Sequence, residues 1–291
     1  MEKEINMSDF VALLGTKGGP AIYPGSNMPT SNLLSMEGHK IVVDCGLGVA
    51  RGLTNQGMHL KDLSIIFITH LHSDHYLELG PLIHTAWTAG LKTSIDVYGP
   101  EGLDLYWQSF LNSMKSDIDL RITDEGRPDL RQLVTFHVID ETKTFKIGDI
   151  KVTALRNIHP PLVDTFALSF KTKKNHIVFG GDTAFMPKLA DFAKGADLLI
   201  HEGILKDAII PLVAKVGNGD GRLLEHLYAA HTLAEDAAKI ANMAQVRVLA
   251  LNHLIPTDDP NFLDQHWRDA IARHWTGEFI LGTDGLRIDL D

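Results

Sequence analysis

The 291-residue chain lacks the features that mark secreted or membrane-embedded proteins. It holds one cysteine, Cys45, which excludes an intramolecular disulfide and fits a reducing compartment. No apolar run is long enough to cross a bilayer, and the first residues lack the basic start and apolar stretch of a signal peptide. With 44% hydrophobic and 22% charged residues, we expect a globular, cytoplasmic protein without a membrane partner.

Positive charge is also scarce. The 27 Lys and Arg residues stand against 37 Asp and Glu, which gives a formal net charge of −10. Nucleic-acid affinity comes largely from Lys and Arg contacts to phosphates, so this balance argues against a polyanionic partner. No internal repeat, low-complexity tract or linker divides the chain.

The chain is rich in metal-binding side chains at one point. Residues 70–75 read His-Leu-His-Ser-Asp-His, which puts three imidazoles and a carboxylate into six positions. The preceding segment 63–68 is rich in β-branched and aromatic residues and predicts a buried strand that ends at this cluster. Side chains on an extended backbone alternate with period two, so His70 and His72 point the same way and can bind one ion.

Asp74 and His75 lie just beyond this pair and can turn towards a second ion. A solvated polar loop would be the better explanation of a lone histidine, but it does not explain this density. Neutral imidazole and carboxylate are ligands that borderline cations such as Zn²⁺ prefer. The cluster therefore indicates a metalloenzyme.

Three further strand ends carry a histidine or an aspartate. His159 follows the alternating segment 150–155 and precedes two prolines, which end regular structure. Asp182 stands in a Gly-Gly-Asp-Thr turn after a short apolar strand, where glycine permits close approach of the backbone to an ion. His253 closes the strand predicted over 246–252. All of these side chains can meet at one site.

Taken together, these motifs resemble those of the metallo-β-lactamase superfamily over nearly the whole chain. The motifs are Asp44-Cys45-Gly46, His70 to His75, His159, Gly181-Asp182-Thr183 and His253. Segments 13–20 and 196–202 and the pair His231-Thr232 are similar to the ribonuclease Z branch. His159-Pro160-Pro161 and segment 252–256 look closer to its arylsulfatase-like and phosphodiesterase-like members.

The resemblance implies an α/β (α+β) fold of the αββα type, with two mixed β-sheets face to face and helices on the outer faces. Because ligands from distant segments must meet at one place, residues 1–291 are expected to form a single domain. Segment 204–228, with apolar residues and hinge-like glycines, is a candidate lid over the site, and a peripheral helix is the alternative. The roles of His84, His201 and His226 are left open.

The resemblance also implies two divalent metal ions. One would be held by His70, His72 and His159, the second by Asp74, His75 and His253, and Asp182 would bridge them. Zinc is expected, with manganese or iron as alternatives, because the site mixes imidazoles with carboxylates and offers no thiolate. A hydroxide between two ions roughly 3.5–4 Å apart is the implied nucleophile.

Two residues carry implied catalytic roles. Asp74 would orient the hydroxide, and His231 matches a family histidine that assists the leaving group. Asp44 is expected behind the ligands, where it would fix an imidazole through its ring N–H.

These features predict a metal-dependent hydrolase of small-molecule, ester-like substrates. Phosphodiester or aryl sulfate substrates rank first, and lactones or amides second. A ribonuclease Z-type tRNA 3′-processing endonuclease is the alternative, and an iron-dependent redox enzyme a further one. Ribonuclease Z carries a long arm between the third histidine and the Gly-Asp-Thr motif, whereas only 22 residues separate His159 from Asp182 here. Nucleic acid is therefore not expected as a partner, and a homodimer is left open.

Overall fold

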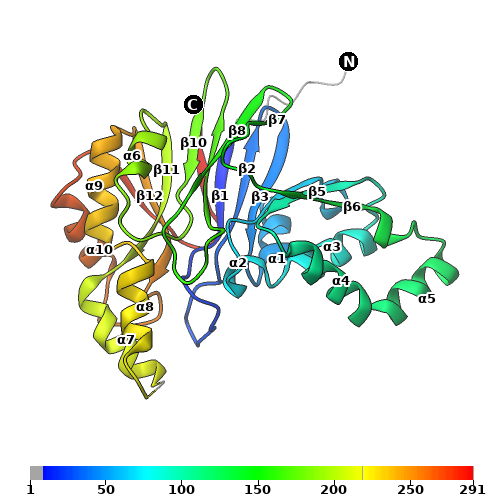
Figure 1. Ribbon diagram of the computed structural model, residues 1–291, viewed down its shortest axis with the longest axis horizontal. Helices are drawn as coiled ribbons and strands as arrows, with labels where there is room; N and C mark the ends of the chain where they lie inside the picture. Colours follow the sequence, from blue (N-terminus) through cyan, green and yellow to red (C-terminus); the bar gives the residue numbers. More distant parts are fainter. Residues whose placement is uncertain (1–8, 218, 291) are drawn as a thin grey trace.

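Two β-sheets face each other at the centre of the computed structural model, which describes residues 9–217 and 219–290 (Figure 1). Each sheet contains seven strands within these described ranges. The first sheet runs in the order β14 (Leu286–Asp289), β1 (Phe10–Gly15), β2 (Ser31–Met36), β3 (His39–Cys45), β4 (Ile65–Phe67), β5 (Ile95–Gly99) and β6 (Val134–Val138). The second runs in the order β13 (Glu278–Leu281), β12 (Val248–Ile255), β11 (Leu198–Ile204), β10 (His176–Phe179), β9 (Phe166–Lys171), β8 (Ile150–Arg156) and β7 (Phe145–Ile147).

Helices cover the outer faces of both sheets. The first sheet carries α1 (Val49–Asn55), α2 (Ser73–Tyr76), α3 (Leu79–Thr88), α4 (Leu103–Ser113) and α5 (Lys115–Glu125). The second carries α6 (Lys188–Phe192), α9 (Ala234–Ala244) and α10 (Asp264–Ala272), while α7 (Ile209–Val216) and α8 (Arg222–Ala230) form a hairpin at one end (Figure 1). The predicted αββα sandwich of two mixed sheets is confirmed. Among the described residues, no helix is long and apolar enough to span a membrane.

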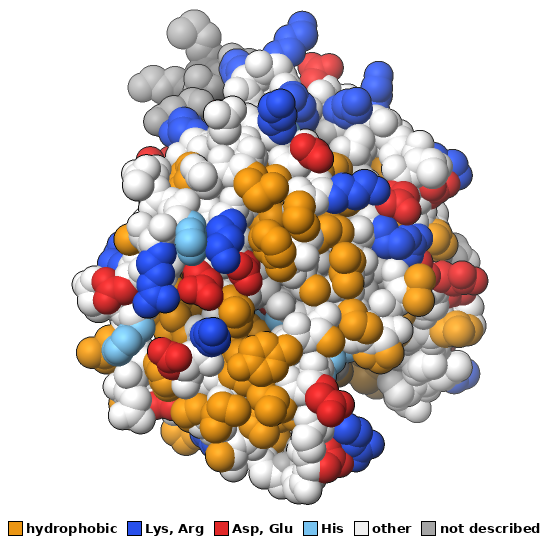
Figure 2. Space-filling model, turned by 60° about the vertical axis from the view of Figure 1, so that its left-hand side comes forward, with side chains coloured by type: hydrophobic (Ala, Val, Ile, Leu, Met, Phe, Trp, Pro, Cys, Tyr) orange, Lys and Arg blue, Asp and Glu red, His pale blue; other side chains and the backbone are white. Residues whose placement is uncertain are grey.

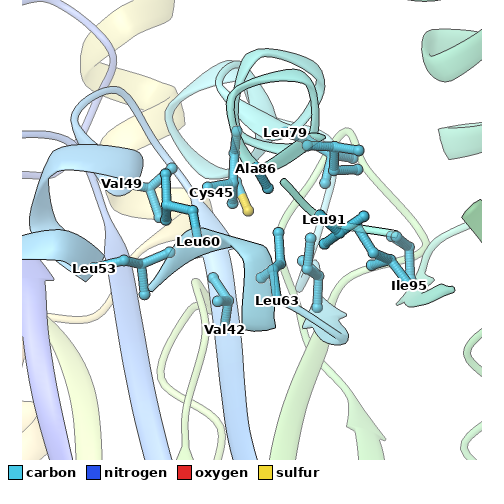
Figure 3. Close-up of a cluster of buried hydrophobic side chains, with 14 of the residues drawn as sticks. Val42, Cys45, Val49, Leu53, Leu60, Leu63, Leu79, Ala86, Leu91 and Ile95 are labelled. Carbon is cyan, nitrogen blue, oxygen red and sulfur yellow. The ribbon is translucent and has the colours of Figure 1, made fainter. Parts of the chain in front are cut away.

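Strand β1 shows why the sequence folds into layers. All six of its residues are buried, and successive side chains point to opposite faces of the sheet. Val11 and Leu13 join the core between the two sheets, whereas Ala12 and Leu14 join the core beneath the helices of the first sheet. A strand covered on both faces reads as a continuous apolar run. Cys45 lies in the helix-side core, as expected for a packing residue (Figure 3).

Both sheets repeat one pattern of strand directions. Three antiparallel pairs are followed by three parallel pairs, the latter joining β3 to β6 in the first sheet and β10 to β13 in the second. Carboxyl ends of parallel strands meet at one edge of a sheet, and ligands bind there in open α/β sheets. The loops after β4 and β10 therefore lie at the same edge of the sandwich, between the two sheets. This edge is the seam between the sheets.

The structure differs from the sequence prediction at His253. The residue does not end its strand but lies inside β12, where the pairing with β11 slips by one residue opposite Glu202 and Gly203. His253 adopts a left-handed backbone conformation, with φ at 46°. Such a conformation costs a non-glycine residue on the order of 1 kcal/mol or more and is typical of functional sites. The bulge turns the His253 imidazole out of the sheet and into the seam.

Candidate metal centre

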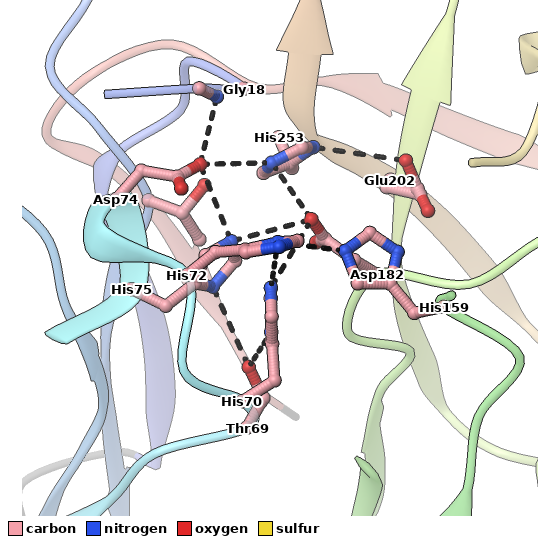
Figure 4. Close-up of polar contacts among 12 residues, drawn as sticks. Gly18, Thr69, His70, His72, Asp74, His75, His159, Asp182, Glu202 and His253 are labelled. Carbon is pink, nitrogen blue, oxygen red and sulfur yellow. Dashed lines mark hydrogen bonds and ion pairs between the residues drawn. The ribbon is translucent and has the colours of Figure 1, made fainter. Parts of the chain in front are cut away.

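The histidines and aspartates expected from the sequence converge at the seam between the two sheets (Figure 4). The first sheet contributes its residues through the loop after β4 and through α2, and the second through the loops after β8 and β10 and through β12 itself. The seven residues are His70, His72, Asp74, His75, His159, Asp182 and His253.

The first group combines His70, His72 and His159, whose ligand atoms lie within 4.8 Å of one another. The Nδ1 atom of His72 lies 2.9 Å from Nε2 of His159 and 3.2 Å from Nε2 of His70. Three imidazole nitrogens facing one point form a ligand set suited to a tetrahedral metal ion with one open position.

The second group combines Asp74, His75 and His253, again within 4.8 Å. Oδ2 of Asp74 lies 3.2 Å from Nε2 of His253 and 3.5 Å from Nε2 of His75. Two imidazoles and a carboxylate thus face a second point beside the first.

Asp182 faces both groups with one oxygen. Its Oδ2 atom lies 3.7 Å from Nε2 of His70 in the first group, and 3.4 Å and 3.0 Å from Nε2 of His75 and His253 in the second. The carboxylate is buried, which makes it costly to keep ionised without positive charge nearby. This arrangement is the one expected of a carboxylate shared by two cations.

The pKa directions of His70, His159 and Asp182 match the protonation states of metal ligands. Burial lowers the pKa of His70 well below its ordinary value and that of His159 to about 4, which leaves both imidazoles neutral. Burial opposes ionisation of Asp182, but His253, His75 and His70 hold the pKa of its carboxyl well below the usual range. Neutral imidazole and ionised carboxylate are the forms that bind metal.

The surroundings of His75 test whether these residues fit a metal ion. Burial opposes its protonation, yet Asp182, Asp74 and Asp44 raise the pKa of the ring well above its ordinary value. Its Nε2 atom is buried and has no hydrogen-bond partner among the described residues, while Nδ1 lies 2.8 Å from Oδ2 of Asp44. A divalent cation at Nε2 would supply the positive charge that the three carboxylates demand. The residues present therefore fit a divalent metal.

Residues behind the ligands fix their rings, a role that the sequence predicted for Asp44. The carboxylate of Asp44 also accepts hydrogen bonds from the backbone and side chain of Thr69, at 2.8 and 2.9 Å. Nδ1 of His159 lies 2.6 Å from the carbonyl oxygen of Ala230. Such contacts set the tautomer and orientation of a ligating imidazole.

His231 lies beside the cluster at the end of α8 and is paired with Glu202 on β11. Nδ1 of His231 is 2.8 Å from Oε2 of Glu202, whose Oε1 accepts the backbone N–H of Thr183. Burial opposes protonation of His231, but Glu202 raises its pKa to about 9. The imidazole is thus held protonated at neutral pH. The sequence pattern did not predict that Glu202, 29 residues earlier in the chain, would be its partner.

A cavity of about 380 Å³ opens onto the cluster. Its polar wall includes His72, Asp74, Asp182, His231 and His253, and its apolar wall comes from Tyr23, Ile255 and the α7–α8 hairpin. Val216 of this lining is an exposed hydrophobic side chain, and so are Ile22 and Tyr228, which are next in sequence to lining residues. Figure 2 shows hydrophobic side chains gathered on this part of the molecule, with histidine visible between them. The hairpin thus forms a wall of the cavity in the segment considered as a lid.

The three histidines whose roles the sequence left open lie in three different surroundings. His226 lines the cavity, with its ring centre 5.4 Å from that of His231 and 5.8 Å from that of His159. His84 lies away from the site and pairs with Asp117 of α5 at 2.9 Å. His201 is buried below the cluster, with Nδ1 3.0 Å from the carbonyl oxygen of Glu202.

The fold and this site define a metal-dependent hydrolase of the metallo-β-lactamase superfamily, in its ribonuclease Z branch. Ribonuclease Z of Mycobacterium bovis is 26% identical over 283 residues, which cover 96% of this chain and 98% of the relative. The chain belongs to the family described as Anti-Pycsar protein Apyc1, whose pattern matches residues 11–211.

Solved structures support the fold. The metallo-β-lactamase fold protein YhfI from Bacillus subtilis superimposes with a TM-score of 0.72 at 21% identity, over 97% of this chain and 99% of YhfI. The short form of human tRNase Z superimposes with a TM-score of 0.66 at 24% identity, over 97% and 99% of the two chains.

These relatives correct the expectation that nucleic acid is not a partner, which is wrong. Proteins named for ribonuclease activity match this chain over 98% of their own length, so they hold no long additional segment. The short interval between His159 and Asp182 therefore does not separate this chain from ribonucleases. The net charge of −10 is a sum over the whole surface, whereas recognition of a phosphate depends on the charges around the cavity.

Proposed function

We propose that this chain is a phosphodiesterase that cleaves RNA with two divalent metal ions, zinc being the first candidate. The observation that carries the proposal is the Asp182 carboxylate, one oxygen of which faces both groups of ligands. Relatives named ribonuclease Z favour a phosphodiester over the aryl sulfate, lactone and amide substrates that the same fold can accept. The absence of a thiolate ligand favours zinc held by nitrogen and oxygen, with manganese or iron as alternatives.

In this proposal, seven residues hold the metal ions, in the grouping His70, His72 and His159, then Asp74, His75 and His253, with Asp182 shared. When bound, two divalent ions activate a water molecule and neutralise charge that develops on the attacked phosphate.

Asp74 would have two tasks. Its Oδ2 atom accepts the backbone N–H of Gly19 at 2.8 Å, so the carboxylate is fixed from the side of the N-terminal loop. The same carboxylate can accept a hydrogen bond from the attacking water and orient it towards phosphorus.

His231 would serve as the general acid. Its Nδ1–H is held by Glu202, and the protonated ring lines the cavity, so Nε2 can donate a proton to the departing oxygen. Proton donation of this kind contributes about 10²–10⁴-fold to a rate.

A substrate panel tests the proposal. The metal-loaded enzyme is incubated at low salt with a 3′-extended tRNA precursor, bis(p-nitrophenyl) phosphate, p-nitrophenyl sulfate and a lactone, beside the Asp182→Ala variant. Low salt strengthens electrostatic contacts to RNA. We expect cleavage of both phosphodiesters by the wild type and neither by the variant. Cleavage of the small phosphodiester alone would refute an RNA substrate, and turnover of the sulfate or the lactone alone would refute the phosphodiesterase.

A further inference from the structure

Lys17 is a buried cation that the site described so far does not use. It lies in the loop after β1 and is only 8% exposed. A fully buried lysine is rare unless a carboxylate pairs with it. Among the described residues its ammonium forms no ion pair, because Asp258 and Asp74, the carboxylates that act on it, pair with Lys215 and His253.

The ammonium donates to two carbonyl oxygens of its own loop. These are the oxygens of Gly18, at 2.8 Å, and Gly19, at 3.4 Å. An ammonium carries three N–H donors, so one donor has no acceptor among the described residues. Lys17 lines the cavity over the metal cluster together with Asp74, Asp182 and His231, and within the described part of the chain no other Lys or Arg lines it. The spare donor therefore belongs to a side chain that borders the substrate cavity.

The loop that carries Lys17 is fastened to the metal cluster. The backbone N–H of Gly19 donates to Asp74, and that of Gly18 donates to the carbonyl oxygen of Leu254 at 3.0 Å. Gly18 packs so closely on the ring of His253 that an added Cβ would lie 2.8 Å from its Cε1 atom. These contacts fix the position of the ammonium relative to the residues that would hold the metal ions.

The charged side chains nearest to Lys17 do not fully compensate its ammonium, so an anion can bind beside it. Burial lowers the pKa of Lys17, while Asp258 and Asp74 act in the opposite direction. The carboxylate of Asp258 is taken by Lys215, whose ammonium lies 2.7 Å from its Oδ2 atom. An anionic oxygen beside Lys17 would offset the burial of the ammonium and would accept the spare N–H.

We propose that the Lys17 ammonium binds a non-bridging phosphate oxygen of the substrate beside the metal centre. This inference deepens the proposed function and rests on it for the phosphate. Lysine binds phosphate as a compact point charge with rotatable donors, which suits an oxygen approached from one side.

The experiment measures binding of inorganic phosphate to the metal-loaded enzyme by calorimetry, with metal content and melting temperature as controls. Lys17→Gln should weaken phosphate binding by roughly 10- to 100-fold, the size of a lost hydrogen bond to a charged group, and should raise KM for a phosphodiester similarly. Lys17→Arg should recover most of the affinity. Lys215→Gln removes the same charge from α7, from a side chain that does not line the cavity and is already paired with Asp258. It should change the affinity less than about threefold, an order-of-magnitude bound for an exposed ion pair. Equal losses in Lys17→Gln and Lys215→Gln, or none in either, would overturn the proposal.

If Lys17→Gln loses its metal, a spectroscopic measurement on the wild-type enzyme tests the same contact. With ¹⁵N at the lysine Nζ atoms of the zinc-loaded enzyme, the Lys17 signal should shift on addition of phosphate while the Lys215 signal stays. A Lys17 signal that does not respond overturns the proposal. Phosphate binding through Lys17 without any phosphodiester hydrolysis would refute the proposed function alone. Hydrolysis with no dependence on Lys17 would refute this inference alone.

Discussion

Replacing Glu202 by glutamine should lower the pH at which the rate begins to decline on the alkaline side. Glu202 raises the pKa of His231 to about 9, against an ordinary value of 6.5. At about 1.36 kcal/mol per pKa unit, this difference is on the order of 3 kcal/mol in favour of the protonated ring. In Glu202→Gln the charge is lost but the contact to Thr183 can remain, so the pKa of His231 should fall to 6.5 or below.

The direction of the pH dependence follows from the raised pKa of His231. The raised pKa of His231 contributes stability that is fully present below about pH 6.5 while Glu202 is ionised, and this contribution is lost as the pH rises through about 9. Burial raises the pKa of Glu202, so the pair is also lost in acid when that carboxyl takes up a proton. A general acid must also be protonated to act, so wild-type kcat should decline towards pH 9, or at lower pH because a nearby divalent cation lowers the pKa of His231. In Glu202→Gln the decline should begin one or more pH units earlier, and the melting temperature at pH 7 should drop.

The assay is a pH–rate profile for a phosphodiester with a poor leaving group, with metal content measured in parallel. Glu225→Gln on the exposed side of α8 is the matched control, because it removes the same charge without contacting His231. An alkaline limb at the same pH in Glu202→Gln and wild type, with full metal content, would refute the assignment of His231 as the acid held by Glu202.

Three further predictions follow from the site. Asp182→Ala should lower metal content below two equivalents per chain and reduce activity more than the roughly 10–100-fold that loss of a residue behind a ligand costs, measured by elemental analysis and kinetics. His231→Ala should keep its metal yet lose about 10²–10⁴-fold in rate, less for substrates with acidic leaving groups; equal losses for all leaving groups would contradict proton donation. Gly18→Ala should lower the melting temperature and the metal affinity because the new Cβ meets His253, whereas Gly221→Ala, whose Cβ meets nothing within 4 Å, should change neither. Unaltered metal affinity in Gly18→Ala would show that the loop does not brace the cluster.

The sequence predicted the architecture and the converging residues because both follow local rules. A buried strand followed by a histidine or an aspartate is visible in a single segment, and four such segments carried the residues of the cluster. The bulge at His253 was not predictable, since a left-handed residue inside an apolar strand leaves no trace in the residue pattern.

Pairings between distant segments were also beyond the sequence. Nothing in the pattern says that Glu202 faces His231, or that Lys17 folds over its own loop into the cavity, because both depend on how the sheets and loops pack. The sequence did not distinguish His84 from His226. In the structure His84 pairs with Asp117 of α5, whereas His226 of α8 lines the cavity. The expectation that nucleic acid is not a partner was wrong for a related reason: total charge and one interval length are poor substitutes for the shape of a cavity.

The division of the cluster between the two sheets has a consequence for the folding of the chain. Asp74 and His75 come from the first sheet and His253 from the second, so the second group of ligands assembles only when segments nearly 180 residues apart have met. Closing so large a loop costs entropy that an ion bound in the seam would help to offset, in the manner of a reversible cross-link. Metal capture would accordingly come late in folding, and a chelator would loosen the docking of one half of the molecule on the other before it melts either half.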